Sequence, residues 1–480
     1  MVFSSPIFLF LFLPVVLLLH GLAPQRARNS ILLAASLFFY AWGETVFVLV
    51  MLFSIAANYI AGRVIAQQSP GASRRVCLGI AVGLNLGLLL AFKYSHFLAE
   101  NYSLLASSMG FAGLELEPLH LPLGISFFTF QALSYLIDVY RESIRVERSP
   151  LTLGLYISLF PQLVAGPIVR YPQIGEALRS RSLSQGDFAE GAQRFTLGLG
   201  KKMLIANTLA VPVDTIFTLP AEGLGASLAW FGIVCYALQI YFDFSGYSDM
   251  AIGLGRMLGF PFPENFNYPY VARSLSDFWR RWHISLSTWF RDYLYIPLGG
   301  NRGSAKTTYR NLILVFLFCG LWHGASWNFA IWGLFHGSFL VIERIGWGAV
   351  LERLPNPLRH AYTLGVVLIA WVFFRAETLG QALAYLGALL GNGVETGEGQ
   401  YLVDFVSIVV GVALLAGMLG ATPWWRHLEA RMRSWEDDGR LSLGTSLGGL
   451  LRPLATAVVF IASAMHLATQ TFNPFIYFRF

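Results

Sequence analysis

Charge and cysteine are both scarce in this chain of 480 residues. Charged residues make up 12% of it, whereas soluble domains carry roughly one-quarter. Hydrophobic residues make up 55%, and the mean hydropathy is +0.57. This composition excludes an ordinary soluble globular protein. The length is enough for many helices of about 20 residues, each able to cross a hydrocarbon core of roughly 30 Å, so the sequence predicts an all-α polytopic membrane protein.

The three cysteines, Cys77, Cys235 and Cys319, each lie in or beside an apolar run. They form no Cys-x-x-Cys pair and no Cys/His cluster with the spacing of a zinc site. We therefore expect no disulfide framework, no metal and no permanently bound cofactor. The net charge of +6 does not indicate nucleic-acid binding, because the arginines lie between hydrophobic spans, where such residues determine membrane topology.

Apolar segments alternate with basic loops along the whole sequence. Their number predicts roughly ten to twelve membrane crossings within a single domain, residues 1–480. The apolar stretch 151–165 has basic residues on both sides, so we expect a re-entrant segment, which must be shielded by protein or water. The least hydrophobic part, 256–310, is rich in arginine and is expected at the cytoplasmic face as short or partly inserted helices.

One histidine, His323, stands in the apolar stretch Phe-Leu-Phe-Cys-Gly-Leu-Trp-His-Gly-Ala, residues 316–325. An ionisable side chain is costly at membrane depth and usually faces a protein interior or a watered cavity. A buried histidine tends to be neutral, the form that can take a proton from a hydroxyl, so His323 suits a general base. The alternatives are a hydrogen bond between helices and a Cys/His nucleophile formed with Cys319, four residues earlier. Buried cysteine is more typical as a small hydrophobe.

The pentapeptide Gly-Leu-Trp-His-Gly, residues 320–324, recurs as Gly-Leu-Phe-His-Gly at 333–337. The 13-residue offset between His323 and His336 turns an ideal helix by about 220°. A break is therefore needed between them if both line one cavity, and Ser326 and Asn328 make it plausible. A structural role for His336 is at least as well supported.

A second histidine, His283, lies in the basic stretch Phe-Trp-Arg-Arg-Trp-His-Ile-Ser-Leu-Ser, residues 278–287. It could orient an acyl group or assist proton transfer. The nearby side chains Arg280, Arg281 and Arg291 could bind the phosphates of a nucleotide-bearing donor. Alternatively, these arginines determine topology or contact lipid phosphates. The carboxylates Asp243 and Asp249, at 241–249, are expected to pair with the arginines of 273–310 as scaffold.

The stretches 241–249, 278–287 and 320–324, together with Arg-Asp-Tyr-Leu-Tyr-Ile-Pro-Leu-Gly-Gly at 291–300, closely resemble the membrane-bound O-acyltransferases. The chain is most similar to the bacterial branch that contains the alginate O-acetyltransferase membrane subunit and the D-alanyl transfer protein of teichoic acid synthesis. The resemblance also takes in residues 1–5, 124–128 and 159–167, and the motif core covers about 121–345. The last third matches only in hydropathy.

The resemblance implies a ring of transmembrane helices and re-entrant segments around a central catalytic cavity, with a cytoplasmic funnel for the donor and an outer opening for the acceptor. In the family, the histidine matching His323 is the main catalytic residue and the one matching His283 is the second. It also implies a multi-pass protein of the bacterial inner membrane that moves acetyl from acetyl-coenzyme A, a substrate, to an exported polysaccharide such as alginate. A periplasmic acetyltransferase-like or esterase-like partner would complete the transfer.

Two other functions remain open at this stage. One is D-alanyl transfer to a cell-envelope polymer, with a carrier protein as the donor. The other is a non-enzymatic conduit for a polymer or solute, which would be expected to show repeat-related halves with broken helices in corresponding positions. The 13-residue echo is the one internal repeat that the sequence offers.

Overall fold

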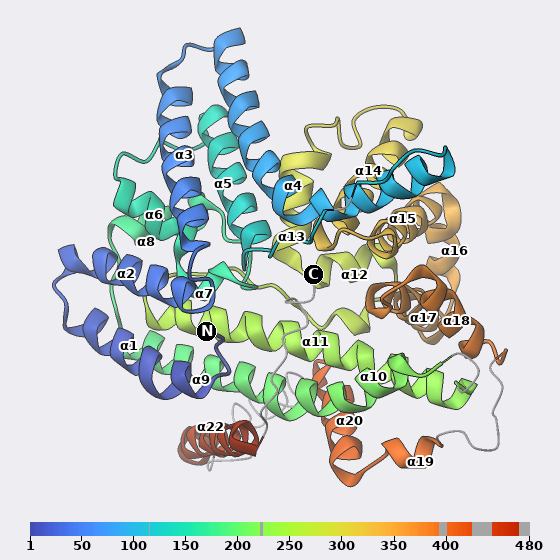
Figure 1. The fold of residues 1–480 in the computed structure, drawn as a ribbon. Helices are drawn as coiled ribbons and strands as arrows, with labels where there is room; N and C mark the ends of the chain where they lie inside the picture. Colours follow the sequence, from blue (N-terminus) through green and yellow to red (C-terminus); the bar gives the residue numbers. More distant parts are fainter. Residues whose placement is uncertain (115, 221–223, 393–400, 425–443, 470–480) are drawn as a thin grey trace.

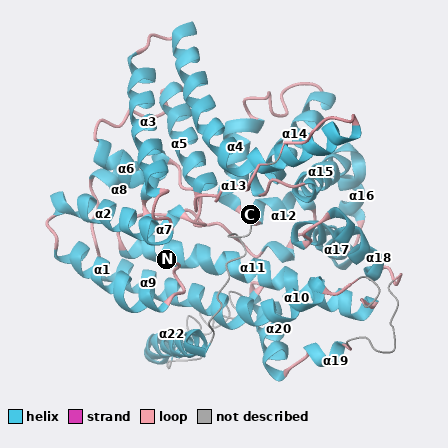
Figure 2. Cartoon of the chain, in the orientation of Figure 1, coloured by secondary structure: helices cyan, strands magenta, loops and turns pink. Residues whose placement is uncertain are grey.

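A computed structural model describes residues 1–114, 116–220, 224–392, 401–424 and 444–469. Every regular element in these ranges is a helix, which confirms the all-α prediction (Figure 2). Six described helical stretches are long and apolar enough to cross a membrane, namely Val48–Gln67, Ala72–Ser108, Ala226–Met257, Trp327–Arg353, Asn356–Arg375 and Arg452–Thr469. The count of ten to twelve crossings stays a prediction. So does the single domain over 1–480, which includes ranges outside the described residues.

The N-terminal helices contain the predicted re-entrant segment. They are η1 (Phe8–Phe12), α1 (Leu13–Leu22), α2 (Gln25–Gly43), α3 (Val48–Gln67), α4 (Ala72–Ser108), α5 (Ile125–Tyr140), α6 (Pro150–Ser158), α7 (Phe160–Leu163) and α8 (Tyr171–Arg179). Between 151 and 165 the chain forms only α6 and α7, each too short to cross a core of roughly 30 Å. Nearly all their residues are buried, so protein shields this backbone as re-entrant structure requires.

The middle helices include the longest buried one, α11. They are α9 (Gln185–Gly200), η2 (Lys201–Ala206), α10 (Asn207–Thr218), α11 (Ala226–Met257), η4 (Pro269–Val271), α12 (Leu275–Arg281), α13 (Ile284–Phe290) and η5 (Arg291–Tyr295). Glycines bring α9 and α11 into backbone contact: a Cβ on Gly191 would lie 2.7 Å from the carbonyl oxygen of Gly253, and one on Gly198 would lie 2.5 Å from that of Gly246. Close backbone approach through small residues is a usual way to pack helices in membranes.

The C-terminal helices begin with an antiparallel pair. They are α14 (Ala305–His323), α15 (Trp327–Ile342), η6 (Glu343–Trp347), α16 (Gly348–Arg353), α17 (Asn356–Arg375), α18 (Leu379–Leu389), α19 (Leu402–Phe405), α20 (Ile408–Gly420) and α22 (Gly444–Thr469). Residues 324–326 are not helical and separate α14 from α15, so the predicted helix break between His323 and His336 is confirmed.

The segment 256–310 forms short helices, as its low hydropathy predicted, and they occupy the middle of the fold, a position that the sequence did not predict. Figure 1 shows α12 and α13 above α11, with the α3–α5 group on one side and α14, α15 and α17 on the other. Four ring contacts tie the short helices to these neighbours, in order α5, α11, α15 and α17: Phe130–Trp289 at 3.8 Å, Phe244–His283 at 4.6 Å, Trp279–Trp332 at 5.8 Å and Trp282–Trp371 at 4.9 Å between centroids. His283 therefore lies inside the helical ring.

Both carboxylates of α11 take part in ion pairs, and the partners of Asp249 differ from those expected. Asp249 lies 2.9 Å from Arg194 and 2.6 Å from Lys201. The carboxylate of Asp243 lies 2.5 Å from the ammonium of Lys202. These cations belong to α9 and η2, so the prediction that Asp249 pairs with the arginines of 273–310 is wrong. The scaffold role fits, because the pairs join α11 to the preceding helices.

Candidate active site

His323 is the last residue of α14, and its side chain is enclosed by aromatic rings. It is 4% exposed, and its ring centroid lies 5.1 Å from those of Trp332 and Phe374 and 4.8 Å from that of Trp322. Gly324, with extended backbone, follows directly. The end of the helix therefore brings the imidazole to a break in the structure within an apolar, desolvated wall.

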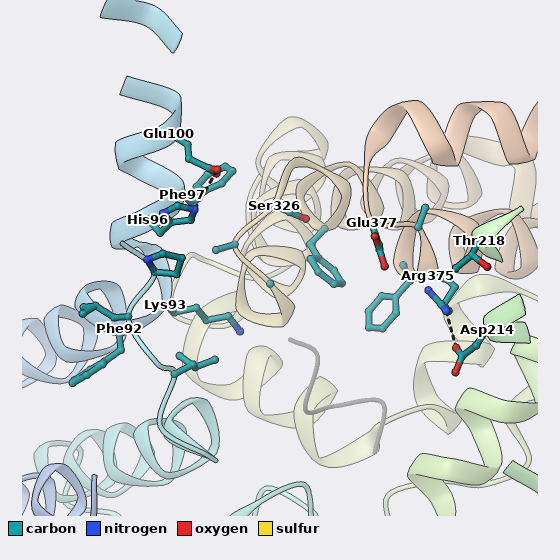
Figure 3. A pocket seen from close by; sticks show the side chains of 18 of the residues that line it. Phe92, Lys93, His96, Phe97, Glu100, Asp214, Thr218, Ser326, Arg375 and Glu377 are labelled. Carbon is teal, nitrogen blue, oxygen red and sulfur yellow. Dashed lines mark hydrogen bonds and ion pairs between the residues drawn. The ribbon is translucent and has the colours of Figure 1, made fainter. Parts of the chain in front are cut away.

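Two cavities meet beside this end of α14. The smaller, of about 90 Å³, is lined by His323, Trp322, Lys93, Val164 and the segment 121–127. The larger, of about 750 Å³, has six acidic or basic side chains in its wall: Lys93, His96, Glu100, Asp214, Arg375 and Glu377. Figure 3 shows Lys93 extending toward the middle of this larger cavity. Lys93 and Leu121 line both cavities, so the small chamber that contains His323 adjoins a polar vestibule.

Lys93 also fastens the end of α14. Its Nζ donates to the carbonyl oxygens of Trp322, at 2.6 Å, and His323, at 2.8 Å, and the hydroxyl of Tyr94 donates to the carbonyl of Leu321. The last carbonyls of a helix have no partner within it, so α4 supplies the partners here. Lys93 was not predicted as a site residue from the sequence, although the rule that singled out His323 also applies to Lys93, a lone cation in an apolar run.

His283 lies between α12 and α13 and is fully buried, with a left-handed φ of 43°. Its Nδ1 is 3.1 Å from Oδ1 of Asn265. The same oxygen accepts from the backbone N–H of Ser285, at 3.2 Å, and from its hydroxyl, at 2.9 Å. Only an acceptor can face a backbone N–H, so this amide atom is oxygen and Nδ1 carries the hydrogen. In the neutral ring, Nε2 then has the lone pair.

The rings of the two candidate histidines both lie beside the ring of Trp322. The ring centroid of Trp322 lies 4.8 Å from that of His323 and 6.2 Å from that of His283. Residues 40 positions apart in the sequence are thus brought to the same aromatic side chain. Asn265, which orients His283, was also missed by sequence analysis, because nothing in its local sequence distinguishes it from a loop asparagine.

The three predicted donor-binding arginines do not line either cavity beside His323. Arg280 is exposed, Arg281 lies 2.9 Å from Asp277, and Arg291 lies 2.7 Å from Asp292. Burial alone would raise the pKa of the Asp292 carboxyl, but hydrogen bonds from Arg291 and Arg170 outweigh it and hold that pKa below its usual value.

A third cavity lies beside one of these arginines. It measures about 230 Å³, is mostly apolar, and is lined by residues that include Arg291, Ser287, Trp279 and Cys319. Cys319 therefore faces a different cavity from His323, which argues against a Cys/His pair. The described residues contain no group of three or more His, Cys, Asp or Glu side chains that could hold a metal ion.

Comparison with known proteins matches residues 118–377 to the model of the membrane-bound O-acyltransferase family. A probable alginate O-acetylase, AlgI, of Pseudomonas putida is 41% identical over 492 aligned positions that cover 100% of both chains. A peptidoglycan O-acetyltransferase of Helicobacter pylori is 40% identical, covering 82% of this chain and 81% of the relative. A teichoic acid D-alanyltransferase of Bacillus subtilis is 32% identical, covering 49% of this chain and 62% of the relative.

Proposed function

Because the chain belongs to the membrane-bound O-acyltransferase family, we propose that it moves an acetyl group from acetyl-coenzyme A to an exported polysaccharide such as alginate. The observation that carries this proposal is the place of His323, in the wall of a small chamber that adjoins a polar vestibule. Full-length similarity to an alginate O-acetylase supports the acetyl group and the polysaccharide. Similarity to a peptidoglycan O-acetyltransferase leaves other glycan acceptors possible.

The basic ends of the helices support an orientation in the bacterial inner membrane. α4 begins beside Arg74 and Arg75, and α14 begins beside Lys306 and Arg310. Positively charged ends stay in the cytoplasm, so the opposite ends of both helices face outward. The larger cavity is lined by those opposite ends, and we propose that it admits the acceptor from the outer side.

In the proposed mechanism, His323 acts as the general base. Its neutral imidazole takes the proton from an acceptor hydroxyl as that oxygen attacks the thioester carbonyl. The C–O bond forms, the tetrahedral intermediate collapses, the C–S bond breaks, and the imidazolium returns the proton to the sulfur. Enclosure by Trp322, Trp332 and Phe374 keeps bulk water from competing with the acceptor.

We propose that His283 assists proton transfer. With Nδ1 committed as a donor to Asn265, the neutral ring accepts hydrogen bonds at Nε2. Polarising the thioester carbonyl from Nε2 would require the imidazolium, which a fully buried site disfavours. Accepting a hydrogen bond at Nε2, which leaves the ring neutral, therefore suits proton transfer better than positioning of the acyl group.

Arg280, Arg281 and Arg291 are proposed to attract the phosphates of the donor at the cytoplasmic mouth. Arg280 and Arg291 are exposed, and an exposed guanidinium can bind a phosphate with paired hydrogen bonds. The donor binds transiently as a substrate. We further propose a periplasmic acetyltransferase-like or esterase-like partner that completes transfer to the polymer outside the membrane.

The test is polymer acetylation in a Pseudomonas host that lacks its own alginate O-acetylase. The wild-type chain should restore polymer-bound acetate, and His323→Ala should abolish it while the protein remains in the membrane. Substantial acetate with His323→Ala would contradict the role of His323.

The same material separates the two alternatives. Purified protein in nanodiscs should consume [14C]acetyl-coenzyme A. Consumption only of D-alanyl thioester on a carrier protein would favour D-alanyl transfer. Polymer acetylation in cells without turnover of any thioester by the purified chain would favour a conduit.

A further inference from the structure

We propose that the ammonium group of Lys93 stabilises the negative charge that develops on the thioester oxygen during acyl transfer, which makes Lys93 a catalytic residue. This inference rests on the proposed function. It goes beyond it because sequence reasoning assigned no role to any residue of α4. It stands on three observations: the hydrogen bonds of Nζ, the cavities that it lines, and the lack of a carboxylate partner.

The hydrogen bonds fix the position of the ammonium and leave it one donor. Two of its three N–H groups are taken by the carbonyl oxygens of Trp322 and His323, at 2.6 and 2.8 Å. No third acceptor for Nζ occurs in the part of the chain that the structure describes. The third N–H is therefore available to a group that enters the cavity. Because both carbonyls belong to the turn that ends with His323, the ammonium and the imidazole are held in one unit.

The cavities place this donor where the reaction would occur. Lys93 and His323 line the same chamber of about 90 Å³, which is on the order of three water molecules at roughly 30 Å³ each. Such a volume suits a small acyl group and excludes a sugar ring from entering completely. Lys93 also lines the vestibule of about 750 Å³, through which the acceptor is proposed to arrive. The side chain thus stands at the boundary between the two reactants.

Within the described ranges, Lys93 lacks the carboxylate partner that both lysines of η2 have. Lys201 lies 2.6 Å from the carboxylate of Asp249, and Lys202 lies 2.5 Å from that of Asp243. Among the described residues, no carboxylate lies within ion-pair distance of Lys93. The negative end of the α14 dipole stabilises the cation only partly. A full anion next to Nζ would be much more favourable, and the reaction produces one.

The anion is the oxyanion of the tetrahedral intermediate. The acceptor oxygen bonds to the thioester carbon as its proton passes to His323, and the carbonyl electron pair moves onto oxygen. Lys93 donates a hydrogen bond to this oxyanion and keeps its proton. When the intermediate collapses, the electron pair on oxygen re-forms the carbonyl, the C–S bond breaks, and His323 protonates the departing sulfur. The ammonium binds the intermediate more strongly than the neutral thioester, so it lowers the barrier.

The experiment uses the full chain in nanodiscs, with [14C]acetyl-coenzyme A as the donor and mannuronate oligosaccharide as the acceptor. Lys93→Met should lower kcat by roughly 100- to 1,000-fold, the usual effect of removing one oxyanion donor, with little change in the KM of the donor. Lys93→Gln keeps a neutral donor for the helix carbonyls and should fold while losing most of kcat. Lys306→Met, at an exposed lysine of α14, is the matched control and should stay within about twofold of wild type.

Chemical rescue separates a catalytic charge from a mechanical clamp. In Lys93→Ala, added ethylammonium should restore kcat in a saturable way, whereas neutral propanol should not. The inference is overturned if Lys93→Gln keeps a third or more of wild-type kcat, or if propanol rescues as well as ethylammonium, or if neither rescues a variant that elutes as folded protein. If the wild-type chain in nanodiscs does not consume acetyl-coenzyme A, the proposed function itself fails.

Discussion

The two copies of the Gly-x-x-His-Gly pattern, at 320–324 and 333–337, have different surroundings in the folded chain. His323 ends α14 and lines a cavity, whereas His336 lies inside α15, is fully buried and lines none of the three cavities described. The Nδ1 of His336 accepts a hydrogen bond from the indole N–H of Trp279 at 3.3 Å. The comparison shows that one short pattern provides a reactive group at a helix end and a packed group in a helix interior.

The shared feature of the two copies is their glycines. A Cβ on Gly320 would clash with the carbonyl of Phe329, and one on Gly333 would clash with that of Phe316. Each would also lie within 3.3 Å of the Cα of the other glycine. Both pentapeptides are thus small-x-x-x-small surfaces that let α14 and α15 pack backbone to backbone. The repeated pentapeptide therefore serves helix packing and does not indicate a duplicated site.

The largest difference in acetyl-transfer rate is expected when His323 and His336 are substituted one at a time. His323→Ala should reduce the rate of acetyl transfer at least 1,000-fold, because general-base catalysis contributes roughly 100- to 10,000-fold and the lost ring also opens the chamber. His336→Gln keeps an acceptor for Trp279 and should retain a third or more of the rate. Polymer-bound acetate measures both, with membrane content as control. Equal loss in both variants would contradict the distinction between them.

Substitution of the facing glycines should have the next largest effect. Gly320→Val places a branched side chain against the backbone of α15, so we expect the variant to be poorly folded, with a large drop in the melting temperature of detergent-solubilised protein. Gly365 faces open space on α17, and Gly365→Val is the matched control. An unchanged melting temperature for Gly320→Val would show that the echo does not serve packing.

A smaller effect is expected from the groups that orient the histidines. Asn265→Ala removes the acceptor for Nδ1 of His283, a buried hydrogen bond worth about 1–3 kcal/mol. This predicts a loss in kcat of roughly 10- to 100-fold. Nitrogen-15 NMR of labelled histidine should show that the His283 tautomer becomes mixed in the variant. Asn267→Ala, at an exposed position two residues later, should change neither; full activity of Asn265→Ala would exclude the positioning role.

The smallest predicted effect concerns the arginines that line neither cavity beside His323. Arg280→Gln and Arg291→Gln should raise the KM for acetyl-coenzyme A about three- to tenfold and leave kcat nearly unchanged, because an exposed charge contributes on the order of 1 kcal/mol to binding. The effect should shrink as salt is added. A fall in kcat with constant KM would instead assign these residues to the chemical step.

The sequence predicted the helical class, the break after His323 and the short helices of 256–310, though not their central position, because hydropathy, glycine and charge act locally. It also singled out His323, since an ionisable group in an apolar run carries its own signal, whereas His283 was singled out by its basic stretch and by the family resemblance. The contribution of α4 could not be predicted, because Lys93 reaches the carbonyls of residues about 230 positions later in the sequence. The cations that pair with Asp249 are likewise distant in the sequence, and Asn265 could not be predicted because its local sequence resembles that of any loop asparagine.

The boundary that Lys93 and Leu121 form between the two cavities has a consequence for how such a protein diversifies. The vestibule can be rebuilt by substitutions at positions such as Glu100, Thr218 or Glu377 that leave the chamber around His323 untouched. A new recipient for the acyl group can then be acquired without inventing a new reaction.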